Sequence, residues 1–317
     1  MKSKKIAAHI ILALSLLMGS VLPLHAEGDK SQVPLADPYI LLDEGKYYAY
    51  GTHDSDGIRC YSSDDLHSWK YEGQALNKVN TTESVWFWAP EVYHIGDRYI
   101  MYYSANEHLY AATADSPKGP FHQVGTYQMN ALLGSEYCID SSVFFDDDGK
   151  AWLFFVRFND GNCIWQCQLA DDYITPLPGT LRKCFAASQP WERKMGRINE
   201  GPNVIKHGRY YYLTFSGNDY HSPDYAVGYA TTTNIATGSW EKYAANPILC
   251  RRDELVGTGH HSLFTDKEGI LRIVFHAHNT TESIHPRLSY IGTARFNGSR
   301  LEITDDPIIR PTVTATP

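Results

Sequence analysis

The sequence predicts an all-β fold, a five-bladed β-propeller whose blades surround a central cavity. A hairpin-like motif recurs five times, and each copy has an apolar run, a turn glycine and a second run rich in aromatic and branched residues. The turn glycines recur every 51 to 61 residues, which leaves room for four short strands in each interval. Radial repetition of four-stranded sheets is a β-propeller, and no stretch has the pattern of a long amphipathic helix.

The five hairpins are predicted in order along the chain. The fullest copy begins with Glu200-Gly201-Pro202, passes through Gly208 and continues into an aromatic run at 210–212. The predicted hairpins span 37–50, 89–103, 140–155, 200–213 and 260–275. Residues 307–317 form a Thr-rich tail, which is either a last strand that closes the ring or a frayed end.

The N-terminal residues 1–26 are predicted to be a secretory signal peptide. They have a basic opening, an apolar core over 6–24 and a small residue, Ala26, at the expected cleavage point. A retained membrane anchor is the alternative. No later stretch approaches ~20 uninterrupted apolar residues, and no linker interrupts the rest. We therefore expect residues 27–317 to form one propeller domain that is exported, soluble and monomeric, in the periplasm or outside the cell.

Composition limits the possible ligands. The net charge of −8 argues against nucleic acid and against an anionic membrane surface. The aromatic share of 13% suits cross-strand packing as well as sugar stacking, and it does not choose between them. Six cysteines are present without a Cys-x-x-Cys spacing, so a zinc site is not expected. Disulfides and buried free thiols both remain open.

Acidic residues and histidines gather at the start of the predicted first strands. Asp37, Asp140 and Glu200 occupy this place in three repeats, and His260 and His261 occupy it in a fourth. The innermost strands of a propeller line its central channel, so these side chains are expected to converge. Such a cluster is costly for folding, because like charges repel and lose their solvent. It favours a site that performs acid/base chemistry or holds a cation.

Each of the three carboxylates also fits a simpler role. Asp37 precedes a proline as turn residues do, Asp140 fits a turn cap, and Glu200 fits an exposed loop. Their shared place in three repeats favours a common site. Glycoside hydrolysis needs such a set: a carboxylic acid that protonates the leaving oxygen, and a carboxylate that activates water. An inverting site separates the two by roughly 6.5–9.5 Å, and a third carboxylate can raise the pKa of the acid.

Five ordered fragments carry a resemblance to a known family. They are Ala36-Asp37-Pro38, Trp88-Ala89-Pro90-Glu91-Val92, Ile139-Asp140-Ser141-Ser142, Asn199-Glu200-Gly201-Pro202 and Gly257-Thr258-Gly259-His260-His261-Ser262. With these fragments the chain resembles glycoside hydrolase family 43, the five-bladed propeller enzymes that cut arabinose- and xylose-containing polysaccharides. The resemblance implies Asp37 as general base, Asp140 as the residue that orients the acid and modulates its pKa, Glu200 as general acid, and inversion at the anomeric carbon.

The resemblance also suggests further site residues. It places a histidine beside a hydrated calcium or other cation on the channel axis. His260 matches the Gly-His position of the family and is the predicted residue, although counting back from the turn glycine aligns His261 with Glu200. Imidazole is a poor direct ligand for Ca²⁺, so the contact is expected through water, or no metal is bound; none is required for the chemistry. Trp86 and Trp88 lie just before a predicted strand; Trp88 is predicted to stack on sugar, and packing between blades is the alternative.

The remaining predictions concern Arg287 and the activity. The resemblance suggests that Arg287 lies against substrate hydroxyls near the acids, and a surface or structural arginine is the alternative. We leave His276 and His278, which share one strand face, unassigned. The leading activity is exo α-L-arabinofuranosidase on polysaccharide or oligosaccharide substrates, with endo-arabinanase, β-xylosidase and galactan-type activities as alternatives. An alternative of another class is a propeller that binds sugar without cutting it. The fructan enzymes fit less well, because Leu35-Ala36-Asp37-Pro38 replaces their Trp-x-Asn-Asp-Pro opening.

Overall fold

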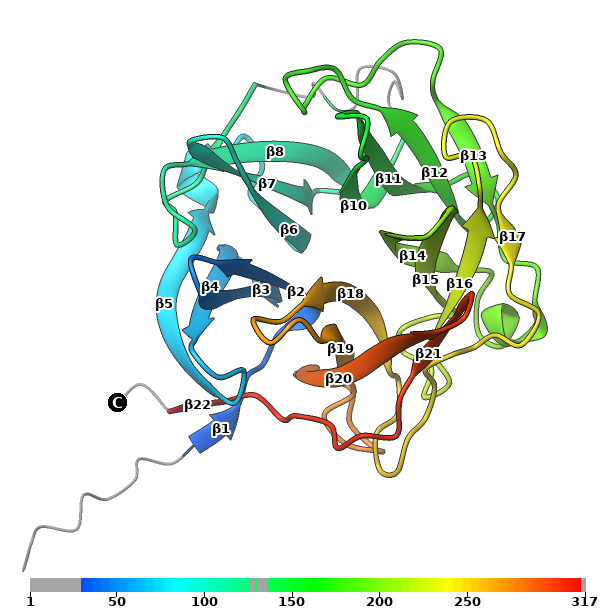
Figure 1. Cartoon of the computed structure of the whole chain (residues 1–317). Helices are drawn as coiled ribbons and strands as arrows, with labels where there is room; N and C mark the ends of the chain where they lie inside the picture. The colour runs from blue at the N-terminus through cyan, green and yellow to red at the C-terminus, as the bar shows by residue number, and fades with distance from the viewer. Residues whose placement is uncertain (1–29, 126–128, 130–135, 315–317) are drawn as a thin grey trace, which may run out of the picture.

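The computed structural model describes residues 30–125, 129 and 136–314, and it confirms the all-β prediction: five small sheets form a ring (Figure 1). The predicted signal peptide, residues 1–26, lies outside the described residues. Blades two to five each hold four strands in sequence order. These strands are β6 (Trp88–Ile95), β7 (Arg98–Ala105), β8 (His108–Ala114) and β9 (His122–Gln123); β10 (Cys138–Phe145), β11 (Ala151–Phe158), β12 (Asn162–Gln168) and β13 (Arg182–Phe185); β14 (Asn199–His207), β15 (Tyr210–Gly217), β16 (Ala226–Thr232) and β17 (Glu241–Lys242); and β18 (Gly259–Thr265), β19 (Leu271–Ala277), β20 (Leu288–Asn297) and β21 (Arg300–Ile303).

Blade one closes the ring with strands from both ends of the described chain. Its sheet has the order β1-β22-β5-β4-β3-β2. The strands are β1 (Lys30–Gln32), β2 (Ala36–Asp43), β3 (Lys46–Asp54), β4 (Gly57–Ser63), β5 (Ser68–Asn77) and β22 (Thr312–Thr314). β22 pairs antiparallel with β1 and parallel with β5. Of the two expectations for the C-terminal tail, the closing strand is therefore right for residues 312–314. Two short 3₁₀ helices, η1 (Lys78–Asn80) and η2 (Pro190–Arg193), lie in loops.

The second strand of each blade is sandwiched between neighbouring sheets. In β11 every residue from Ala151 to Arg157 is buried, and in β15 the same holds from Tyr211 to Gly217. A strand covered on both faces needs continuous apolar residues rather than alternation, which explains the aromatic runs in the sequence. Each fully buried aromatic or branched side chain contributes about 1.5–3 kcal/mol of apolar burial. In the described part of the chain, no helix has the length and apolar character needed to span a membrane.

The first strand of every blade lines the centre and carries a β-bulge near its beginning (Figure 1). At the bulge one residue has a positive φ, a conformation that L-residues rarely adopt. The five residues are Asp37 (48°), Ala89 (44°), Asp140 (58°), Gly201 (54°) and His260 (40°). The bulge bends each first strand, so that the residues around it are re-aimed where the five blades meet.

Candidate active site

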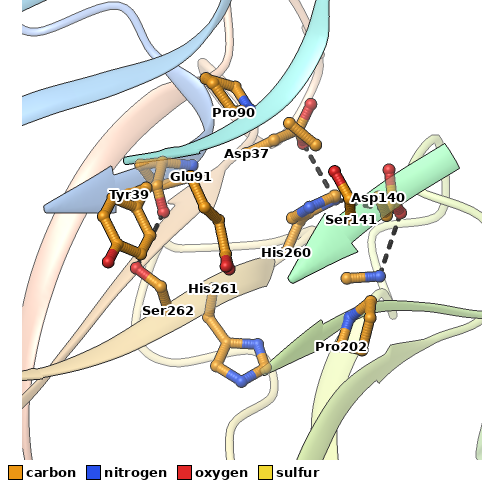
Figure 2. Close-up of a pocket in the computed structure, with 13 residues that line it drawn as sticks. Asp37, Tyr39, Pro90, Glu91, Asp140, Ser141, Pro202, His260, His261 and Ser262 are labelled. Atoms are coloured by element: carbon orange, nitrogen blue, oxygen red, sulfur yellow. Dashed lines mark hydrogen bonds and ion pairs between the residues drawn. The ribbon is translucent and has the colours of Figure 1, made fainter. Parts of the chain in front are cut away.

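The bulges surround an open pocket of about 310 Å³ at one end of the central channel. It is lined by Asp37, Trp88, Ile139, Asp140, Asn162, Ile198, Glu200, Asp219, Tyr220, His260 and Arg287. The pocket therefore brings together all six residues that the sequence singled out: the three carboxylates, Trp88, Arg287 and His260. Deeper in the channel lies a second, small cavity of about 10 Å³, reached by Asp37, Asp140 and His260 from the other side (Figure 2).

The bulges correct the alignment that was counted from the turn glycines. Gly201 occupies the bulge of blade four, so Glu200 lies one position before the place held by Asp37 and Asp140. His260 occupies the bulge of blade five, so it and not His261 corresponds to the two aspartates. The count failed because the hairpin turns differ in length, whereas the bulge is a fixed feature of each first strand.

Each bulge is fastened to the preceding blade by its backbone N–H. The acceptor atoms belong to His276 for Asp37, Thr52 for Ala89, Ser104 for Asp140, Asp140 for Gly201 and Ser216 for His260. Four of these acceptors occupy one equivalent place, opposite the residue before the bulge. In blade three that place is held by Val156, which cannot accept a hydrogen bond. The Asp140 carboxylate takes over, accepting from Gly201 N–H at 3.0 Å, and this fixes Asp140 beside Glu200.

Asp37 is buried but held in its ionised form. Its Oδ1 accepts from an Arg287 Nη1 at 2.9 Å and lies 3.2 Å from His260 Nδ1 and 3.3 Å from His276 Nδ1. Burial alone would raise the pKa of Asp37, but the Arg287 charge and the two imidazole rings hold that pKa well below its usual range. An ionised carboxylate at a pocket wall can take a proton from water.

Glu200 is shifted in the opposite direction. Burial, helped by the negative charges of Asp37 and Asp219, raises the pKa of Glu200 to about 7. Two hydrogen bonds oppose this rise: Tyr225 Oη donates to Oε1 at 2.8 Å, and Asn162 Nδ2 donates to Oε2 at 3.1 Å. A carboxyl group that is protonated for much of the time near neutral pH can donate a proton.

Asp140 titrates together with its neighbours. Burial, then the charges of Glu200 and Asp37, raise the pKa of Asp140 well above its usual range, while the hydrogen bond from Gly201 N–H opposes the rise. Asp140 and Glu200 are therefore best regarded as a coupled pair, and a proton on one favours ionisation of the other. The pocket thus holds an ionised carboxylate, Asp37, with a pair that retains a proton.

Comparison with known proteins shows which family has this fold. Residues 31–295 match the sequence model of glycosyl hydrolases family 43. The chain belongs to this family. An endo-1,4-β-xylanase structure from Bacteroides thetaiotaomicron is 41% identical, covering 90% of this chain and 99% of that chain with a TM-score of 0.85. A β-D-galactofuranosidase from Aspergillus niger is 28% identical over 83% of this chain and 79% of its own length. An extracellular exo-α-(1→5)-L-arabinofuranosidase from Cellvibrio japonicus is 24% identical over 88% of this chain and 87% of its own length.

This family 43 protein is therefore a glycosidase that hydrolyses O-glycosyl bonds. Its fold is that of the family, as the sequence predicted. Membership decides against the alternative of a propeller that binds sugar without cutting it. The fructan enzymes are likewise not the matching family.

The family 43 site contains residues that sequence reasoning did not assign. His276 and Tyr225 lie fully buried behind the pocket, with their rings stacked 5.7 Å apart, so they connect the surroundings of Asp37 and Glu200. Tyr220 covers the Arg287 guanidinium at 4.4 Å, and its carbonyl oxygen is 2.8 Å from His278 Nε2. The alternation of His276 and His278 on one strand face was the available signal for both histidines. No sequence pattern around Tyr225 indicated a role, because its hydrogen bond to Glu200 becomes visible only in the folded structure.

The small cavity does not fit a hydrated cation as its residues stand. Its volume of about 10 Å³ is close to the space of one water molecule. His260 Nδ1 already faces Asp37 at 3.2 Å, and no group of three or more metal-ligating side chains is arranged for an ion among the described residues. The buried Ser141 Oγ and both His261 ring nitrogens lack a hydrogen-bond partner and line this cavity. One water would suit these groups better than an ion with its hydration shell.

Glu91 is a fourth buried carboxyl, and it lines the same small cavity (Figure 2). Burial raises the pKa of Glu91 to about 7, although hydrogen bonds with Tyr93, Ser142 and Asn203 oppose the rise. It faces the channel below the open pocket and is not among the residues that line that pocket. The six cysteines are free thiols in the structure, and four of them are buried, so the expectation of buried free thiols, not of disulfides, holds for those four.

Proposed function

We propose that this enzyme is an inverting exo-glycosidase, with α-L-arabinofuranosidase as its leading activity. The observation that carries the proposal is the opposite shift of two carboxyl groups in one pocket: Asp37 is held ionised, while the pKa of Glu200 is raised to about 7. The propeller carries Asp37 and Glu200 on different blades, and this arrangement supports an inverting reaction in which one is the base and the other the acid. The exo-arabinofuranosidase and the galactofuranosidase among the relatives both support a terminal furanosyl unit as the group removed.

In the proposed mechanism Asp37 is the general base and Glu200 the general acid. Asp37 takes a proton from a water molecule whose oxygen attacks the anomeric carbon. The bond from that carbon to the leaving oxygen breaks, and the leaving oxygen takes the bond's electron pair and the proton from Glu200. Asp140 orients Glu200 through the Gly201 N–H, and the two carboxyl groups titrate as a coupled pair that retains a proton. Asp37 gains a proton and Glu200 loses one, and exchange with solvent restores both.

The remaining pocket residues have supporting roles in this proposal. Trp88 offers an aromatic face to the apolar side of the sugar ring. Arg287 both keeps Asp37 ionised and presents guanidinium hydrogens to sugar hydroxyls. His260 supports Asp37, and the chemistry needs no metal. We further propose that residues 27–317 act as a monomer outside the cytoplasm after removal of residues 1–26; the extracellular relative supports the export.

The test combines a substrate panel with product stereochemistry. Hydrolysis of 4-nitrophenyl α-L-arabinofuranoside, β-D-xyloside and β-D-galactofuranoside would be measured beside Glu200→Gln. We expect release from the arabinofuranoside, and proton NMR should show the opposite anomer appearing first. Retention of configuration would contradict the proposed roles. Release only from the galactofuranoside or the xyloside would keep the mechanism and change the sugar.

A second candidate function is endo cleavage of xylan. The 41% identity to the endo-1,4-β-xylanase structure, over nearly its whole length, favours it. An enzyme of this kind would leave the aryl glycosides intact and shorten xylan to oligosaccharides. Reducing-end assays on linear xylan and linear arabinan therefore separate the two candidates.

A further inference from the structure

The segment before β6 turns two tryptophans in one direction and a phenylalanine in the other. Phe87 is only 1% exposed and stacks on Tyr103 inside the core between blades one and two. Trp86 and Trp88, on either side of Phe87, stack on each other with ring centroids 5.7 Å apart and an interplanar angle of 16°. Trp88 lines the open pocket. Trp86 therefore continues the aromatic wall of the pocket toward the outside.

Trp86 is expected to reduce the stability of the fold. Half of its surface (50%) is exposed, so its large apolar ring gains little from burial. Its backbone has a φ of 60°, a conformation that is a genuine outlier for a bulky residue. Both ends of the segment are fastened: Asn106 N–H donates to the Val85 carbonyl at 3.0 Å, and Ala89 N–H donates to Thr52 Oγ1 at 2.9 Å. Strain held in place at a pocket mouth is typical of a functional residue.

The surroundings indicate what the exposed ring could bind. Stacking on Trp88 covers one face of Trp86, so the exposed half lies on its other face and edges. In the neighbouring blade Tyr137, 54% exposed, precedes β10 at the same end of the blades as Asp140, which is the end where the pocket opens. Flat aromatic faces suit the apolar C–H face of a sugar ring. A glycan bound in the pocket would reach this surface with its next unit, because Trp86 stacks on the pocket residue Trp88.

We propose that Trp86 binds the sugar unit that follows the one held in the pocket, with Trp88 as the ring between them. This inference rests on the proposed function and extends it. The substrate is then a glycan of at least two linked units, and its affinity increases with chain length because of Trp86.

The experiment measures binding without cleavage. In a Glu200→Gln background, calorimetry would follow α-1,5-arabino-oligosaccharides and β-1,4-xylo-oligosaccharides of one to four units. Trp86→Gly removes the ring and also relieves the positive φ, Trp86→Phe keeps an aromatic face, and Val79→Ala is the control. Val79 is 80% exposed in η1 and apart from the pocket lining, so it matches Trp86 as an exposed apolar residue.

We expect Trp86→Gly to weaken binding of the tetramer about three- to tenfold and of the monosaccharide much less, whereas Trp86→Phe should retain most of the affinity. The melting temperature of Trp86→Gly should rise, which separates lost binding from lost folding. Tetramer binding within about twofold of the parent in Trp86→Gly would overturn the inference and leave the proposed function standing. If the parent binds no sugar of any length, the proposed function itself fails. A dimer that dissociates with Trp86→Gly would assign the ring to a second copy and also overturn the inference.

Discussion

Replacing Arg287 by Met should move the acid limb of the pH profile, because Arg287 is the main positive charge that keeps Asp37 ionised. Arg287 Nη1 lies 2.9 Å from Asp37 Oδ1, and both side chains are nearly buried, at 11% and 7% exposure. Two charges about 4 Å apart attract by about 4 kcal/mol at an effective dielectric of 20, and an arginine typically lowers the pKa of a neighbouring Asp by about 1–3 units. The general base must be deprotonated, so kcat/KM of Arg287→Met should begin to fall at a pH about 1–3 units higher than in the wild type.

The same contact contributes to stability, and the sign follows from the direction of the shift. The pKa of Asp37 is lower in the folded than in the unfolded chain, so its contribution is present above the unfolded pKa of about 3.9 and is lost as pH falls through the folded pKa. Arg287→Met should remove about 1.4–4 kcal/mol of unfolding free energy at pH 7, and this difference should shrink as pH falls below about 3.9 toward the lowered folded pKa. Arg272→Met is the matched control, since Arg272 pairs with the buried Asp266 at 2.7 Å outside the pocket. An unmoved acid limb in Arg287→Met, or an equal movement in Arg272→Met, would refute the reasoning.

Three further predictions follow from the contacts around the acid and the base. Tyr225→Phe removes a hydrogen bond that favours ionised Glu200, so the basic limb of kcat/KM should rise by about one pH unit from its position near 7; a fall would contradict the assignment. His276→Ser keeps an acceptor of the kind that Ser104 and Ser216 supply in other blades but loses the imidazole beside Asp37. Its kcat/KM should drop about 10- to 100-fold with an acid limb at higher pH, and a purely structural role would lower the melting temperature alone. Dialysis against EDTA should leave kcat unchanged, because the proposed acid and base need no metal; loss of activity restored by Ca²⁺ would show that a cation is required.

The five-bladed ring could be predicted because each blade repeats a visible unit. The turn glycines and the aromatic second strands are local features, and the sandwiching of β11 and β15 explains their apolar runs at 151–156 and 210–213. The meeting of Asp37, Asp140 and Glu200 in one pocket followed from their place at the start of first strands. The sequence therefore contained the architecture and the principal acids.

The finer arrangement depends on features that leave no regular trace in the sequence. The bulge places Gly201, and not Glu200, at the position that Asp140 holds in its own blade, and hairpin turns of unequal length hide this shift of one residue. The coupling of Asp140 to Gly201 depends on Val156 standing where other blades have a hydrogen-bond acceptor. Contacts between residues of different blades form only in the closed ring, so the pattern of a single strand cannot predict them.

The most direct test of the central claim, that Glu200 supplies the proton to the leaving oxygen, is the dependence of Glu200→Gln on the leaving group. The kcat of this variant would be compared with that of the wild type on a 2,4-dinitrophenyl glycoside and on the corresponding unactivated disaccharide. A good leaving group needs little protonation, so we predict nearly normal rates on the first substrate and a loss of about 10²–10⁴-fold on the second. Equal losses on the two substrates would contradict the role of Glu200 as the general acid.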